Sequence, residues 1–122
     1  MQPLAIVFYE RLMPGSQLVN RLQDLHYRVL ALDNAARLAA TVQREMPLLL
    51  VADLAAKGEV LEAIKKIRSA EATGHVPIIA FAPDGKPDLL AAAQAAGANL
   101  AVTESALAGH LPHMLEQALH VD

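Results

Sequence analysis

The sequence predicts an α/β fold in which helices cover both faces of a parallel sheet. Five short apolar runs alternate with five segments whose apolar residues have helical spacing. Strands that alternate with helices favour parallel pairing through right-handed crossovers. A chain of 122 residues supports one core, so residues 1–122 are expected to form a single domain. We therefore predict a (βα)5 domain with the flavodoxin-like strand order 2-1-3-4-5.

The expected strands are apolar runs too short for helices. They lie at 4–8, 27–32, 48–52, 76–82 and 100–102. The run LLLVA at 48–52 is the most apolar, which places it at the centre of the sheet.

The expected helices start or end on residues with a preference for those positions. The first should begin after the break MPGS at 13–16, with Ser16 as its N-cap. The second follows an N-cap at Asp33 or Asn34 and ends before Pro47. The others are expected at about 59–72, 88–96 and 106–120, and Gly97 ends the fourth.

Composition argues against several classes of function. The net charge is −3, whereas nucleic-acid binders normally carry a basic face. The absence of cysteine excludes disulfides, thiolate nucleophiles and cysteine-ligated metals. Aromatic residues make up only 3% of the chain, which disfavours ligand recognition by stacking. No apolar run approaches the ~20 residues of a membrane span, and the start of the chain lacks a secretory pattern, so a cytoplasmic protein is expected.

Three segments at the ends of the predicted strands resemble the receiver domains of two-component response regulators. PLLLVADL at 47–54 resembles their "PDLVLLDL", and VPIIAFA at 76–82 resembles "vPIIaLTA". AGANLAVTE at 96–104 resembles "aGAddylvKP". The segments occur in the family's order and extend the resemblance over nearly the whole chain. The resemblance implies that Asp53 stands at the position of the phosphoacceptor aspartate.

The other positions that this resemblance identifies depart from the receiver pattern. Receivers hold magnesium with the phosphoacceptor and two acidic residues after the first strand, a position taken here by Tyr9 and Glu10. A hydroxyl after the fourth strand and a lysine after the fifth contact the phosphoryl group, but here they are Ala82 and Glu104. Ala101 replaces the aromatic residue whose rotamer follows phosphorylation.

These departures predict a degenerate receiver that is not an enzyme and signals through protein–protein interaction. Glu104 places negative charge where phosphoryl transfer needs a cation. Glu10 and Asp53 could still bind magnesium weakly, and no other cofactor is expected. Lys57 or Lys86 could in principle supply a displaced cation, but both are interpreted as solvated loop lysines. One alternative is a genuine response regulator whose Asp53 is phosphorylated by a histidine kinase in a phosphorelay; another is a flavodoxin-like small-ligand binder.

The expected partner is a signalling protein or the chain's own effector domain, with no role for nucleic acid or membrane. Receivers often dimerise or bind partners through the face made by helix four, strand five and helix five. The corresponding candidates here are Leu89, Ala92 and Ala95, in a stretch with few charges. The late cluster of His110, His113, Glu116 and His120 is interpreted as an exposed helix face rather than a metal site.

Overall fold

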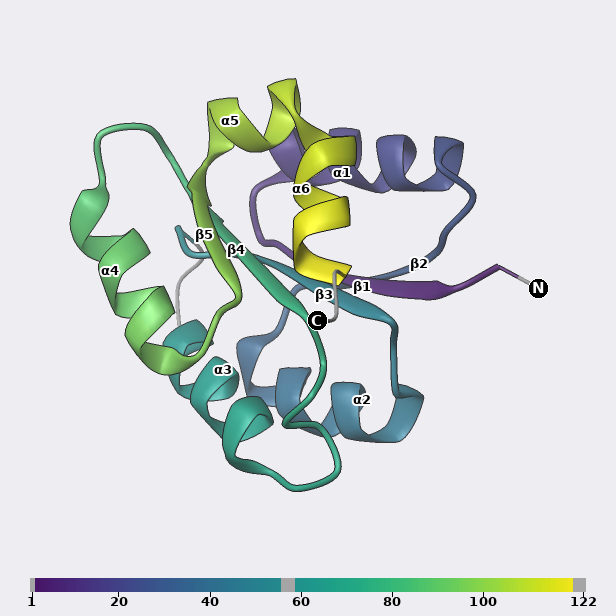
Figure 1. Ribbon diagram of the computed structural model, residues 1–122, viewed down its shortest axis with the longest axis vertical. Helices are drawn as coiled ribbons and strands as arrows, with labels where there is room; N and C mark the ends of the chain where they lie inside the picture. Colours follow the sequence, from purple (N-terminus) through teal and green to yellow (C-terminus); the bar gives the residue numbers. More distant parts are fainter. Residues whose placement is uncertain (1, 56–58, 120–122) are drawn as a thin grey trace.

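The computed structural model confirms the predicted sheet. It describes residues 2–55 and 59–119, without the side chains of residues 12–14. Five parallel strands lie in the order β2-β1-β3-β4-β5 and form a twisted sheet (Figure 1). They are β1 (Leu4–Phe8), β2 (Arg28–Leu32), β3 (Leu49–Asp53), β4 (Ile78–Ala82) and β5 (Leu100–Thr103). The order places β1 and β3 side by side, so the loop after β1 lies next to the end of β3.

Helices cover both faces of the sheet, as predicted (Figure 1). The helical elements are α1 (Leu12–Asp24), a 3-10 helix η1 (Ala35–Arg37), α2 (Leu38–Glu45), α3 (Val60–Ser69), α4 (Pro87–Ala96), α5 (Glu104–Gly109) and α6 (Leu111–Leu119). The side chain of Asn34 accepts a hydrogen bond from the Ala36 N–H at the start of η1, which confirms it as a cap. Gly97 ends α4 with φ of 121°, a backbone conformation that favours glycine. Within the described ranges, no helix combines the length and apolar character needed to cross a bilayer.

The core consists of two apolar clusters separated by the sheet. Alternate residues of each strand point to opposite faces, so Ile6 and Phe8 join one cluster while Ala5 and Val7 join the other. The first cluster packs against α2, α3 and α4 through residues such as Leu38, Val42, Ile64, Ile67 and Ala93. The second packs against α1, α5 and α6 through residues such as Leu18, Leu22, Leu107, Leu111 and Leu115.

The start of α1 differs from the prediction. The helix begins at Leu12, so Ser16 lies inside it and is not the N-cap. Pro14 is accommodated because the first N–H groups of a helix have no intrahelical partner. Gly15 serves packing rather than a turn, since a Cβ there would lie 2.1 Å from Cδ2 of the Tyr9 ring. The earlier start makes Arg11 the residue that immediately precedes the helix.

The last predicted helix is divided into α5 and α6, which meet at His110. Pro112 explains part of this break, because it has no N–H to donate to the Ala108 carbonyl one turn earlier. That carbonyl instead accepts a hydrogen bond from the guanidinium of Arg21 on α1. The break is therefore compensated by a contact between two helices on the same face of the sheet.

Candidate functional site

Asp53 is the last residue of β3 and lies at the carboxyl edge of the sheet. The strand was expected to end at Ala52 and extends one residue further. Its side chain is completely buried, with 0% exposure. Oδ1 accepts a hydrogen bond from the Ala55 N–H at 2.9 Å, which fixes the carboxylate over the turn that follows the strand. A buried carboxylate requires a positive partner or several donors.

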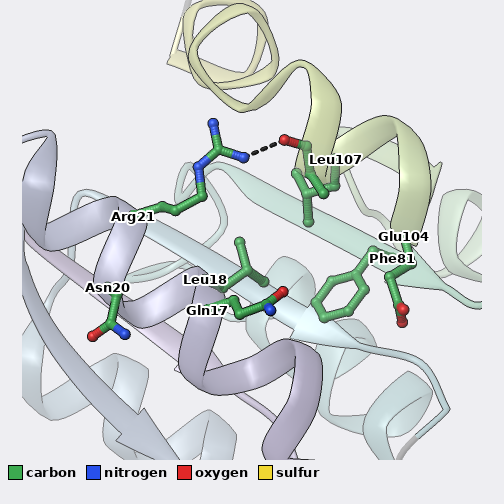
Figure 2. A pocket seen from close by; sticks show the side chains of 8 residues that line it. Gln17, Leu18, Asn20, Arg21, Phe81, Glu104 and Leu107 are labelled. Atoms are coloured by element: carbon green, nitrogen blue, oxygen red, sulfur yellow. Dashed lines mark hydrogen bonds between the residues drawn. The ribbon is translucent and has the colours of Figure 1, made fainter.

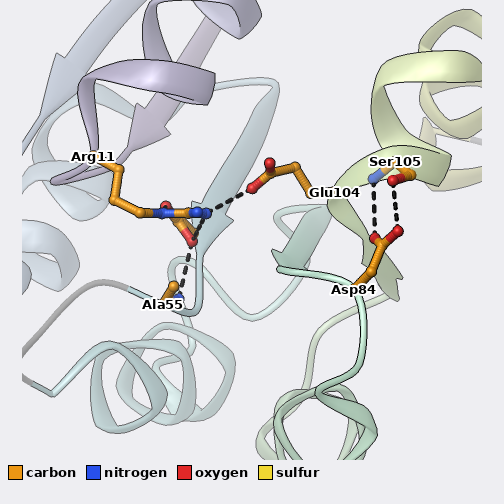
Figure 3. A network of polar contacts seen from close by, with 6 residues as sticks. Arg11, Ala55, Asp84, Glu104 and Ser105 are labelled. Atoms are coloured by element: carbon orange, nitrogen blue, oxygen red, sulfur yellow. Dashed lines mark hydrogen bonds and ion pairs between the residues drawn. The ribbon is translucent and has the colours of Figure 1, made fainter.

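Arg11 provides that positive partner. Its Nε donates to Oδ2 of Asp53 at 2.8 Å, and its Nη2 donates to Oδ1 at 3.0 Å. Nη2 also donates to Oε1 of Glu104 at 2.8 Å, so one guanidinium joins two carboxylates (Figure 3). The hydrogen bond to Asp53 is the main cause that raises the pKa of Arg11, and the bond to Glu104 adds to it. The three side chains form a cluster, hereafter the Arg11 cluster, that carries a formal charge of −1.

Sequence reasoning missed Arg11. It considered Lys57 and Lys86 as the sources of a displaced cation at this edge. Lys57 lies outside the described residues, and Lys86 is exposed before α4 and is not among the described hydrogen-bond partners of Asp53. Its place in the sequence could have indicated it. Arg11 follows the end of β1 by three residues, and β1 neighbours β3 in the predicted strand order, so Arg11 is expected near Asp53.

The remaining predicted site residues come from the loop after β1, from the end of β4 and from β5. Tyr9 packs its ring against α1 at Gly15, and Glu10 is exposed in the loop after β1. Ala82 ends β4 and is completely buried in the core. Ala101 is half-buried in β5 beside Ala80. Tyr9, Ala82 and Ala101 are not among the described hydrogen-bond partners of the Asp53 carboxylate.

A second polar contact holds the start of α5 from the other side. Ser105 Oγ donates to Oδ2 of Asp84 at 2.6 Å, and the Ser105 N–H lies 3.4 Å from Oδ1 (Figure 3). Asp84 belongs to the loop between β4 and α4. The first turn of α5 is therefore tied to this loop through Ser105 and to the start of α1 through Glu104.

The oxygen donors at this edge do not fit a magnesium ion in the present arrangement. Magnesium requires near-octahedral oxygen ligation, usually with one or two carboxylates. Both oxygens of Asp53 and Oε1 of Glu104 already accept hydrogen bonds from Arg11. Elsewhere in the described part of the chain, no group of three or more His, Asp or Glu side chains is placed to hold a metal, including the residues near His113.

The solved structures that match this chain include response regulators and receiver domains. A candidate response regulator from Chloroflexus aurantiacus matches with a TM-score of 0.89 and 18% identity over 98% of both chains. The receiver domain of a sensor histidine kinase from Pseudomonas aeruginosa, solved with magnesium in its active site cleft, matches with a TM-score of 0.85 and 18% identity over 98% of both chains. A chemotaxis response regulator of Vibrio cholerae matches with a TM-score of 0.79 and 16% identity over 93% of this chain and 98% of its own.

Comparisons with models of protein families and with curated protein sequences give no match. At these identities the structural matches establish the fold. The chain has the fold of response-regulator receiver domains, with the strand order 2-1-3-4-5 that the sequence predicted.

Proposed function

We propose that this chain is a receiver-fold module of two-component signalling that acts by protein–protein contact and is not phosphorylated at Asp53. One observation carries the proposal: the guanidinium of Arg11 donates to both oxygens of the Asp53 carboxylate. The module is a signalling component rather than an enzyme, and we assign it to the cytoplasm.

The chemistry of phosphoryl transfer supports this proposal. A carboxylate attacks phosphorus through a free oxygen, and cations placed against the phosphoryl oxygens neutralise the developing charge. Arg11 instead binds the nucleophilic oxygens themselves, and Asp53 Oδ1 also accepts the Ala55 N–H. Glu104 stands at the family's lysine position and would repel an incoming phosphoryl group.

We further propose that magnesium binds at most weakly, through Glu10 and Asp53, and that no other cofactor is used. An entering divalent cation would have to displace Arg11, which is held by three hydrogen bonds to two carboxylates. In receivers, a hydroxyl residue and an aromatic residue couple phosphorylation to a change at the surface. Ala82 and Ala101 occupy these two positions here, and an alanine side chain has no alternative rotamers. Partner binding is therefore constitutive in this proposal.

Radiolabel transfer from acetyl phosphate in the presence of magnesium tests the phosphorylation part of the proposal. The wild-type chain should incorporate no label under conditions in which an intact receiver is labelled. The matched control is Asp53→Asn, which removes the acceptor and keeps the side-chain size. Label that appears in the wild type and is absent from Asp53→Asn would favour the alternative, a genuine response regulator with an atypical site.

Affinity capture from the source organism tests the interaction part. Wild type and Asp53→Asn should capture the same signalling partner in equal amounts, because the charge state of residue 53 does not control the contact. Loss of the partner in Asp53→Asn, with an unchanged circular dichroism spectrum, would contradict constitutive binding.

A further inference from the structure

A pocket of about 270 Å³ lies between α1 and α5, and Phe81 of β4 contributes to its lining (Figure 2). Its lining is mainly apolar, and the apolar floor comes from Leu18, Phe81 and Leu107. Its polar rim includes Gln17, Arg21 and Glu104. The volume is just below the roughly 300–1,000 Å³ typical of small-molecule sites, which suits a ligand smaller than a drug molecule.

The two charged residues of the rim, Arg21 and Glu104, lie on opposite sides of the apolar part of the pocket. Figure 2 shows Arg21 directed toward the end of α5, where its guanidinium donates to the Ala108 carbonyl. Glu104 lies beside Phe81 on the other side. Arg21 is thus hydrogen-bonded to the last turn of α5, whereas Glu104 forms the acidic end of the pocket.

The negative formal charge of the Arg11 cluster favours a positively charged ligand at the acidic end of the pocket. Among the described residues, one guanidinium faces two carboxylates, so one negative charge of the cluster has no described counter-charge. Arg11 contacts Oε1 of Glu104, and the Glu104 side chain remains 35% exposed. A cation that entered the pocket would meet this carboxylate and complete the charge balance.

We propose that the pocket between α1 and α5 binds a small organic cation, with an ammonium head at Glu104 and an apolar body over Leu18, Phe81 and Leu107. The body is held by burial of apolar surface, and the head by an ion pair. This inference goes beyond the proposed function, because it depends on the pocket and Glu104 and not on whether Asp53 is phosphorylated. The ligand and Arg11 share Glu104, so binding weakens the contact between α1 and α5 and leaves the Arg11–Asp53 pair in place.

Nuclear magnetic resonance titration with three probes of similar size tests the proposal. Phenethylamine carries the cation, 2-phenylethanol is neutral and 3-phenylpropionate is anionic. Phenethylamine should shift the backbone amides of Leu18, Glu104 and Leu107 in a saturable way. We expect it to bind about two- to fivefold more tightly than 2-phenylethanol, the factor that corresponds to a partly exposed ion pair. The anion should bind most weakly.

Glu104→Gln should remove the preference for the amine while the neutral probe still binds. The matched control is Glu116→Gln, an exposed carboxylate on α6 outside this pocket, which should keep the preference. The proposal is wrong if the amine gives no saturable shifts, if the three probes bind equally, or if Glu104→Gln keeps the preference. It is also wrong if the same amides shift with protein concentration alone, because a second copy of the chain then fills the pocket.

Discussion

The guanidinium of Arg11 lies against the carboxylate of Asp53 with two hydrogen bonds, across a separation of 42 residues in the sequence. This pairing lets an aspartate remain completely buried at the edge of the sheet, because an unpaired buried charge is strongly destabilising. Arg11 is 33% exposed, so it closes the edge toward solvent. Among the described side chains, Arg11 therefore both stabilises the Asp53 carboxylate and separates it from solvent.

Replacing Arg11 with Gln should turn the Arg11 cluster into a divalent-cation site. Without the guanidinium, Asp53 and Glu104 present two carboxylates with no positive charge between them. Affinity for magnesium should then rise by roughly tenfold or more, because added carboxylate charge strengthens cation binding. Isothermal titration calorimetry with Mg²⁺ and Mn²⁺ measures the change.

The control for this prediction is Arg37→Gln, which removes an exposed cation from η1 and keeps the net charge equal to that of Arg11→Gln. It should bind magnesium as weakly as the wild type. Equal affinities in all three proteins would mean that Arg11 is not what limits metal binding.

The two members of the ion pair should contribute unequally to stability. Arg11→Ala should lower the free energy of unfolding by about 3 kcal/mol, because it leaves Asp53 buried without a cation. Asp53→Asn should cost only about 1 kcal/mol, since the amide oxygen can still accept the Ala55 N–H. Urea unfolding followed by circular dichroism measures both. Equal losses, or no loss in Arg11→Ala, would contradict the assigned role of Arg11.

Ser105→Ala should loosen the loop between β4 and α4 without unfolding the domain. The variant loses the hydrogen bond to Asp84 that ties this loop to α5. Amide hydrogen exchange near Asp84 should accelerate, while global stability changes by no more than about 0.5 kcal/mol. Ser69→Ala is the control, because its hydroxyl bonds only to its own helix. Exchange rates near Asp84 that match the control would show that the contact does not restrain the loop.

The sheet could be predicted from sequence because its signals are local. Apolar runs of three to seven residues, separated by helical periodicity, are sufficient to indicate the five strands and their parallel order. Asn34 and Gly97 act at single positions through their own backbone or side-chain preferences, and both were identified. Asp53 was placed at the correct edge because the end of an apolar run marks where polar residues become tolerated.

The cation of the site could not be predicted because it depends on side-chain reach across the sheet edge. Met13 to Ser16 suggested a break, so α1 was expected to start later and Arg11 was left in a loop. The first turn of a helix tolerates proline, and the glycine there is explained by the Tyr9 ring, which only the tertiary structure reveals. The division between α5 and α6 also required a distant partner, because Arg21 satisfies the carbonyl that Pro112 leaves without a donor.

Tyr27 should ionise above the usual pH range of tyrosine. Burial raises the pKa of its phenol, because desolvation disfavours the charged form. The folded state then holds the proton more tightly than the unfolded state, so this contribution to stability is present below about pH 10 and is lost as the pH rises further. The chain has no tryptophan, so tyrosinate absorbance can be followed directly. Tyr27→Phe should remove the late step; a titration of Tyr27 at or below pH 10 would contradict the prediction.

The outer side of α4 should mediate self-association or partner binding. Ala95 is exposed on this helix, Leu89 and Ala92 are half-buried, and the intervening Ala93 belongs to the core. Between Asp88 and Glu104 the sequence has no ionisable side chain, so a partner could approach without desolvating a charge.

Ala95→Arg should abolish the association and leave the melting temperature nearly unchanged, because the new side chain extends into solvent in the isolated chain. Ala92→Arg should also abolish it, with some loss of stability since Ala92 is half-buried. The matched control is Ala36→Arg, which adds the same charge at an exposed position in η1, away from α4. Sedimentation velocity measures self-association, and affinity capture measures the partner. Association that persists in both α4 variants, at the level of the Ala36→Arg control, would place the interface on another surface of the domain.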